Sequence, residues 1–307
     1  MNFSNKIESE IQLLLAYLKS GLDYEVIKDI IDSPYEDLKS YTQQVYPQDK
    51  VEILSEFFSY QDLLNFTYES KVFNKDLKRQ IIKILAYPLL LYFLMYALML
   101  FFMLILLPAM FNIIELFEID LSSIQLLSKL LKATFIGLSI FNVILIFVLI
   151  THLNHERLRL SLIRYSNLQL PKAIYTYQFA HFFYLLVKHG FSTKQALEIM
   201  RRGSDNRLIG WLATLIMYKL EAGKPFSKSI DLDVLDNRFI SICQLGIINN
   251  QLPSLLETYL NTNHLVISNR LKQIGSMIKL FTYSLLAILI LFMYQILLAP
   301  LSLMGNL

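Results

Sequence analysis

The chain has 307 residues, of which 55% are hydrophobic and only 17% are charged, and its formal net charge is +3. This balance is unusual for a soluble domain and indicates apolar surface that faces lipid. A single cysteine, Cys243, excludes an internal disulfide and is too few for a cysteine metal site.

The first polar segment, residues 1–83, has apolar residues at helical spacing rather than in strand alternation. A first helix should end at Gly21, because glycine readily adopts the left-handed backbone of a helix terminus. Asp23 can cap a second helix, and Ser33 with Glu36 has the spacing of a capping box for a third. We therefore expect three short antiparallel helices, with later helices reduced. The apolar face of the second helix should be Val26, Ile27, Ile30 and Ile31.

Three stretches carry no formal charge, at 84–114, 133–155 and 280–307. Each is long enough to cross a hydrocarbon layer of about 30 Å, which takes roughly 20 helical residues. The sequence therefore predicts an all-α membrane protein with two related cytoplasmic helical-bundle domains and three transmembrane helices. The expected segments are a shortened first cytoplasmic domain (1–83), the first span (84–111), an extracytoplasmic loop (112–132), the second span (133–155), the second cytoplasmic domain (156–279), the third span (280–300) and an extracytoplasmic carboxyl terminus (301–307).

Basic residues gather on one side of these spans, and basic flanks stay in the cytoplasm. The short loop has only Lys129 and Lys132, and nothing basic follows the third span. We expect a multi-pass protein of the cell membrane with its amino terminus inside and its carboxyl terminus outside. The basic residues on the expected inner side are Lys71, Lys75, Lys78, Arg79, Lys83, Arg157, Arg159, Arg164, Lys172, Arg270, Lys272 and Lys279.

The second polar segment repeats the opening of the first at an offset of 169 residues, so that Gly190 corresponds to Gly21. Ser192 with Gln195 should cap the next helix. A further helix should run from about residue 205 to Gly223, and a last one should begin near Pro253 and continue into the third span. Leu107-Pro108 and Ala299-Pro300 end the first and third spans alike. These echoes favour an internal duplication of helical domain plus span.

At this point the chain resembles the F-type inner-membrane platform proteins of type II secretion and type IV pilus systems, and among them most the members found in competence pseudopili. The resemblance covers nearly the whole chain. One stretch departs from the family pattern Gly-Glu-x-x-Gly-x-Leu, because Ile247 replaces the glutamate and Asn250 replaces the second glycine. Asparagine tolerates the left-handed backbone, so the turn could persist. The residues that match the family motifs are Gly21, Tyr87, Pro88, Pro108, Gly190, Gly223, Gly246, Leu252 and Pro300.

The resemblance implies a membrane platform that couples a cytoplasmic hexameric ATPase to the extraction of pilin-like subunits and to filament assembly, with DNA uptake as the expected purpose. It implies no enzyme activity and no cofactor, and it implies contacts with membrane lipid and a homo-oligomer. The sequence is consistent with an energy source in a partner, because Gly223-Lys224 is followed by Pro225 rather than by the Ser or Thr of a phosphate-binding loop. The alternative is a small oligomeric transporter or channel, which would need polar groups along a pathway.

Charge is divided unequally between the two polar segments. Residues 156–279 contain 16 basic and 8 acidic side chains, and residues 1–83 contain 10 and 14, so their net charges are +8 and −4. A basic surface can attract an acidic partner or anionic lipid. We take Arg201, Arg202 and Arg207 as the candidate ATPase-docking patch, with topology and solubility as the alternative role. We expect no direct nucleic-acid binding, because no nucleic-acid module accompanies the charge.

Polar side chains inside the predicted spans seek partners. Asn142 and Gln295 should form hydrogen bonds between helices, and a pilin contact is the alternative. His152 and His155 stand three residues apart, but interfacial anchoring is favoured over a metal site because no further ligand lies nearby. Pro88 and Pro108 are interpreted as breaks at the start and end of the first span helix, with a bend within the span as the alternative.

Overall fold

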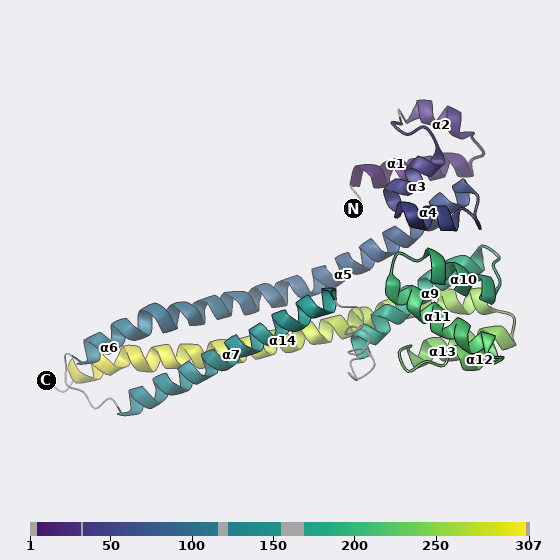
Figure 1. Ribbon diagram of the computed structural model, residues 1–307. Coiled ribbons are helices and arrows are strands. Elements are labelled where there is room, and N and C mark those ends of the chain that lie inside the picture. The colour runs from purple at the N-terminus through teal and green to yellow at the C-terminus, as the bar shows by residue number, and fades with distance from the viewer. Residues whose placement is uncertain (1–4, 32, 116–121, 155–168, 305–307) are drawn as a thin grey trace. The chain divides into compact units, whose positions relative to one another are not determined.

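The computed structural model describes residues 5–31, 33–115, 122–154 and 169–304 (Figure 1). Within these ranges all regular secondary structure is helical and no strand occurs, as the periodicity predicts. The chain folds into two compact units. The lobe unit comprises Met1–Arg79 and Leu160–Ile267, and the long-helix unit comprises Gln80–Arg159 and Ser268–Leu307.

The first lobe contains four short helices rather than the predicted three, followed by the start of a long helix. The expected cap at Ser33 is wrong. Its Oγ instead accepts a hydrogen bond from the Tyr35 N–H at 3.1 Å and bonds the Tyr41 hydroxyl at 2.5 Å. This local turn competes with helix initiation, and the third helix is capped by Asp37, which accepts from the Ser40 N–H at 2.8 Å. The elements are α1 (Asn5–Lys19), α2 (Tyr24–Ile30), α3 (Leu38–Val45), α4 (Gln48–Leu54) and α5 (Tyr60–Phe101).

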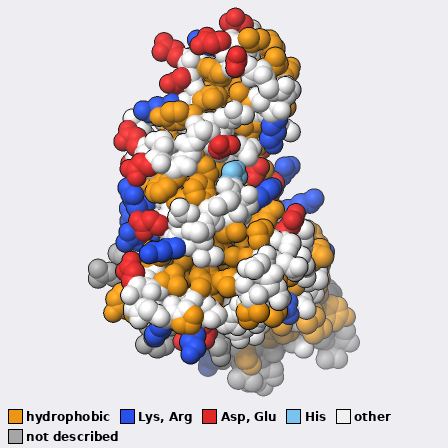
Figure 2. Space-filling model, turned by 90° about the vertical axis from the view of Figure 1, so that its right-hand side faces the viewer, with side chains coloured by type: hydrophobic (Ala, Val, Ile, Leu, Met, Phe, Trp, Pro, Cys, Tyr) orange, Lys and Arg blue, Asp and Glu red, His pale blue; other side chains and the backbone are white. Residues whose placement is uncertain are grey.

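The surface of the first lobe combines acidic and hydrophobic side chains (Figure 2). On α2 only Ile27 is fully buried, whereas Val26 and Ile30 are 50% and 55% exposed. The predicted apolar face is therefore wrong at Val26 and Ile30. The reason is geometric, because a helix of seven residues has two turns and the lobe covers only the side that carries Ile27.

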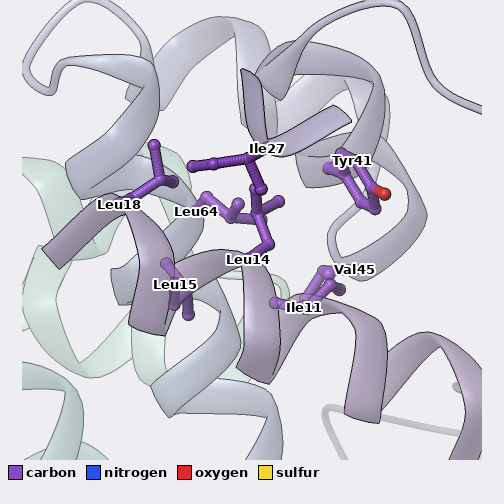
Figure 3. Packing of buried hydrophobic residues seen from close by; sticks show 8 residues of the cluster. All are labelled: Ile11, Leu14, Leu15, Leu18, Ile27, Tyr41, Val45 and Leu64. Carbon is purple, nitrogen blue, oxygen red and sulfur yellow. The ribbon is translucent and has the colours of Figure 1, made fainter. Parts of the chain in front are cut away.

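The core of the first lobe forms where α1 meets α2, α3 and the beginning of α5 (Figure 3). Helical spacing along α1 places four side chains on one face, and Leu64 of α5 closes the cluster. Burying such aliphatic side chains contributes about 1.5–3 kcal/mol each. The cluster consists of Ile11, Leu14, Leu15, Leu18, Ile27, Tyr41, Val45 and Leu64.

The second lobe follows the predicted pattern closely. The capping box at the start of its second helix is confirmed, because the Ser192 Oγ accepts from the Gln195 N–H at 3.3 Å and the Gln195 side chain accepts from the Ser192 N–H at 3.0 Å. The helix expected to end at Gly223 is present as α11. The elements are α9 (Gln169–Lys188), α10 (Thr193–Gly203), α11 (Arg207–Glu221), α12 (Phe226–Ser229), α13 (Asn237–Ile248) and α14 (Leu252–Met304).

Two helices pass from the lobes into apolar sequence without a break. The last helix, α14, has 53 residues and confirms the prediction that a helix beginning near Pro253 continues into the third apolar stretch. The first long helix, α5, has 42 residues and runs through Pro88. The interpretation of Pro88 as a helix start is therefore wrong, since about eight helical turns precede it in α5.

Pro108 also lies within helix rather than at its end. A π-helical segment, η1 (Phe102–Leu106), precedes it, and α6 (Leu107–Glu115) continues beyond it. In η1 the turn is widened, and the Leu107 N–H bonds the Phe102 carbonyl five residues earlier. Proline lacks the N–H of a normal helical turn, and a π segment accommodates that loss without ending the helix.

In the long-helix unit, α5, η1 and α6 pack with α14 and with α7 (Ser122–Asn154) around an apolar cluster. Among the residues searched, Tyr60–Ala109 and Leu252–Gln295 are long and apolar enough to cross a membrane. The predicted second span lies on α7 as far as Asn154, and residue 155 lies outside the described residues. The cluster contains Met99, Phe102, Leu107, Leu131, Leu138 and Leu289.

Candidate functional site

Three of the glycines that carry the sequence resemblance end helices in the same way. Gly21, Gly190 and Gly223 have φ of 87°, 87° and 80°. Each glycine N–H bonds the carbonyl three residues earlier, and the next N–H bonds the carbonyl five residues before it. This double hydrogen bond defines a Schellman turn. A Cβ at these positions would meet nothing within 4 Å, so the backbone conformation rather than space favours glycine.

The altered family motif keeps its turn. Asn250 has φ 53°, and Gln251 donates its N–H to the Gly246 carbonyl at 2.9 Å. The sequence-based expectation that Asn250 can replace glycine is thus confirmed. Gly246 is constrained differently, because a Cβ there would lie 2.9 Å from the Cα of Leu252. The two residues that match the motif therefore contact each other, and Ile247 stands at the glutamate position.

A buried polar contact joins the two lobes and was not anticipated from the sequence. The Tyr46 hydroxyl donates to the Gly203 carbonyl at 3.2 Å and accepts from the Asp205 N–H at 2.9 Å. Lys71 lies 3.5 Å from the Asp205 carboxylate. Burial, with the Asp205 charge nearby, raises the pKa of Tyr46 well above its usual value. The phenol is therefore a structural bridge between lobes.

Aromatic rings extend the same contact. Phe66 of α5 meets Phe182 of α9 edge-on with centroids 5.0 Å apart. Phe73 stacks on His181 with centroids 3.6 Å apart and planes 8° apart. Burial lowers the pKa of His181 to about 3, so this imidazole is neutral. His181 thus acts as a packing ring between α5 and α9.

The contact between the lobes also includes a close approach of the Leu54 side chain to Gly203. An added Cβ at Gly203 would lie 2.4 Å from Cδ2 of Leu54, the last residue of α4. Leu54 is fully buried. Lys50 of α4 donates to the Arg202 carbonyl at 3.0 Å, which satisfies a carbonyl at the end of α10. The lobes therefore interlock through α4 and α10.

The candidate arginine patch is divided between different contacts. Arg202 pairs with Glu56 of the first lobe at 3.1 Å and lies over the Phe57 ring, so it belongs to the lobe contact. Arg201 pairs with Glu198 on its own helix at 2.7 Å. Arg207 is exposed at the start of α11. Arg202 is therefore tied to the first lobe by an ion pair, whereas Arg201 pairs within its own helix.

The polar side chains of the long-helix unit include helix-to-helix contacts. Tyr92 of α5 donates its hydroxyl to Asn142 Oδ1 of α7 at 3.1 Å, which is the kind of bond expected for Asn142. Gln295 is exposed on α14. Tyr87 is exposed, and its neighbour Pro88 faces Gly275 of α14, where an added Cβ would lie 3.2 Å from the proline Cγ.

Several predicted positions fall outside the description. His155 and the side chains of His152 and Pro300 lie outside the described residues, although α14 includes position 300. Within the part of the chain that the structure describes, no three His, Cys, Asp or Glu side chains gather as a metal site. Cys243 is buried in α13, which raises the pKa of its thiol.

Part of the second half of the chain matches a known protein family. Residues 179–300 match the family model described as Type II secretion system (T2SS), protein F. The matched segment runs from within α9 through the second lobe and along α14 to Pro300. A domain of this family implies an inner-membrane platform protein of a secretion or pilus system. A search of curated proteins found no match.

Proposed function

We propose that this chain is the assembly platform of a type IV pilus-like or type II secretion machine, serving a competence pseudopilus for DNA uptake. One observation carries the proposal. The matched segment includes the second lobe and most of α14, and α14 is a single unbroken helix that begins in the lobe and continues through the third apolar stretch. Such a helix can carry a displacement of the lobe to the lipid-embedded segment, because its backbone hydrogen bonding is continuous between the two parts.

The proposed topology has three spans, both lobes in the cytoplasm, and the α6–α7 connection and the carboxyl terminus outside. The basic flanks support this orientation. Reporter fusions in whole cells test it. A cytoplasmic reporter should be active after residue 56 and after residue 224, and an exported reporter should be active after residue 307. An exported reporter active in either lobe would refute the topology.

In this proposal the chain transmits force and does not generate it. A hexameric ATPase supplies the energy, and pilin-like subunits enter the filament through contacts with the platform. The absence of a phosphate-binding loop in the sequence supports the division of labour. Purified full-length protein should hydrolyse no ATP alone and should co-purify with the ATPase. Hydrolysis by the isolated chain would refute the proposal.

We place the ATPase contact on Arg201 and Arg207. Arg201→Glu and Arg207→Glu should each reduce ATPase co-purification, because both side chains are exposed and each change reverses a basic charge. Lys194→Glu is the matched control, since it reverses an exposed charge on the same helix as Arg201. Equal binding by all three variants would move the docking surface elsewhere.

Deletion of the chain tests the cellular role. The deletion strain should lose filament assembly and DNA uptake, and the full-length chain should restore both. Intact filaments without the chain would refute an assembly platform. Lost filaments with normal DNA uptake would refute the competence assignment and leave the platform role in place.

A further inference from the structure

The last charged side chains before two of the apolar stretches are lysines. Lys83 of α5 precedes the stretch that begins at residue 84, and Lys279 of α14 precedes the stretch that begins at residue 280. Each lysine is followed four residues later by a tyrosine, Tyr87 or Tyr283. Residues four apart are neighbours on one face of a helix, so both stretches begin with a lysine and a tyrosine side by side.

The two tyrosines bring these pairs together within the long-helix unit. The hydroxyl of Tyr283 on α14 forms a hydrogen bond with the hydroxyl of Tyr87 on α5. Both side chains nevertheless stay accessible, since Tyr87 is 57% and Tyr283 is 49% exposed. The four side chains therefore form one surface cluster, which we call the Lys–Tyr cluster and which consists of Lys83, Tyr87, Lys279 and Tyr283.

The Lys–Tyr cluster offers hydrogen-bond donors that are not used within the described residues. Lys83 is exposed and Lys279 is half-buried, and neither forms an ion pair or a hydrogen bond with another described residue. A phenol has one O–H, so the bond between the tyrosines uses one of their two protons and leaves the other for a ligand. Two ammonium groups and one phenol O–H can therefore donate to a bound anion.

Acidic side chains are scarce around the cluster. Within the described part of the long-helix unit, Glu115 is the only acidic residue, and it lies at the end of α6. On α5 the nearest acid is Asp76, two turns before Lys83. Two basic residues, Lys78 and Arg79, stand between them. The charge beside the cluster therefore favours a negatively charged ligand.

Apolar side chains beyond the cluster favour a lipid over a free anion. Leu90 and Leu94 follow Tyr87 at helical spacing on α5, and each is 57% exposed. Ile290 follows Tyr283 two turns later on α14 and is 51% exposed. Acyl chains that lie along these side chains hold a headgroup at the level of the lysines, and inorganic phosphate has no such anchor.

We propose that the Lys–Tyr cluster binds the phosphate of an anionic phospholipid in the leaflet on the lobe side of the membrane. The polar headgroups of a bilayer lie directly beside the hydrocarbon, which is where the charge-free stretches begin. Tyrosine favours this interface because its ring is apolar and its hydroxyl is polar. Phosphatidylglycerol fits better than phosphatidylethanolamine, whose own ammonium group would meet the two lysines. The inference goes beyond the proposed function, since it requires neither the ATPase nor a pilin.

Native mass spectrometry of the purified full-length chain in detergent tests the site, with these two phospholipids as probes. The chain should bind its first phosphatidylglycerol more tightly than its first phosphatidylethanolamine. Lys83→Gln with Lys279→Gln should weaken this first binding step about fivefold for each charge removed. Lys83→Arg with Lys279→Arg should retain it. Lys129→Gln with Lys132→Gln is the matched control, because it removes two exposed charges from α7 and should leave the first step unchanged.

A second pair of changes separates hydrogen bonding from net charge. Tyr87→Phe with Tyr283→Phe keeps every charge and should still weaken the first phosphatidylglycerol about tenfold, because a hydrogen bond to a charged group is lost. Tyr294→Phe changes another exposed phenol of α14 and should have no effect. Without added lipid all variants should melt at the temperature of the unchanged chain, since the cluster side chains are exposed or half-buried.

Four results would overturn the proposal. Equal losses in the α7 control would show that net charge alone attracts the lipid, and equal binding of the two phospholipids would show no preference for an anion. Displacement of phosphatidylglycerol by millimolar inorganic phosphate would assign the cluster to a free anion. Unchanged lipid binding in both the lysine and the tyrosine variants would place the lipid elsewhere.

Discussion

Gly203 offers the sharpest test of the contact between the lobes. An alanine Cβ at this position would lie 2.4 Å from Cδ2 and 2.9 Å from Cγ of Leu54. Both distances are shorter than a carbon–carbon contact allows, so the lobes must shift or Leu54 must leave its position. Overpacking of this kind costs about 1–3 kcal/mol. Alanine gains up to about 1 kcal/mol over glycine inside a helix, but Gly203 is the last residue of α10 and gains less.

Whether Gly203→Ala destabilises or stabilises the protein should depend on Leu54. The three heavy atoms nearest to the added Cβ all belong to the Leu54 side chain. Leu54→Ala alone should cost about 2–5 kcal/mol, because it leaves a cavity at a fully buried site. In that background Gly203→Ala meets no clash and adds helix propensity, so it should be neutral or stabilising. The coupling between the two changes should be on the order of 1–2 kcal/mol.

Thermal unfolding of the full chain in detergent, followed by the single tryptophan, measures this coupling. Trp211 lies on α11 of the second lobe and therefore reports on that lobe. Gly137→Ala is the control, because a Cβ on that glycine of α7 would meet nothing within 4 Å. If Gly203→Ala changed the melting temperature equally with and without Leu54, the interlocking of α4 with α10 would be wrong.

Three further predictions concern single residues. Asn250 has φ 53°, a left-handed conformation that glycine adopts readily and a β-branched residue does not. In thermal unfolding, Asn250→Gly should therefore be neutral or stabilise by up to about 1 kcal/mol, and Asn250→Val should destabilise by more than that. Equal effects of the two variants would argue against a left-handed turn. Burial lowers the pKa of His181 to about 3, below its value near 6.5 in the unfolded chain. The free energy of unfolding should therefore decrease as the pH falls from 6.5 towards 3, by about 2 kcal/mol at pH 5. His181→Phe should remove most of this pH dependence, and an unchanged slope would assign it to other groups. Tyr92→Phe should cost about 0.5–1.5 kcal/mol of stability by removing the bond to Asn142, and no further loss is expected when Asn142→Leu is already present.

The features that sequence predicted are those decided by a few neighbouring residues. The turns at Gly21 and Gly190 follow from glycine after an apolar helix, and the Ser192–Gln195 box follows from spacing alone. The helix through Pro253 was predictable because apolar periodicity continued beyond the proline. In each case the chemistry that fixes the structure lies within one or two helical turns.

The contact between the lobes depends on residues far apart in the chain. Tyr46 and Asp205 are separated by 159 positions, and the sequence around either residue does not predict its contact with the other. A tyrosine that ends a short helix also looks like any other helix terminus. The same limit explains the error at Val26 and Ile30, because helical spacing identifies an apolar face but does not say whether another element covers it.

The duplication also extends into the long helices. Tyr60 begins α5 and Leu252 begins α14, and the prolines Pro108 and Pro300 each follow 48 positions later. The equal spacing favours a repeat that includes the long helices, but the joint length of lobe and helix is not repeated, because Gly21 precedes Tyr60 by 39 residues and Gly190 precedes Leu252 by 62. The repeats nevertheless meet through unlike elements, α4 of one and α10 of the other. The contact between the lobes therefore does not follow from the repeat itself, and likeness between the two halves of the sequence could not have predicted it.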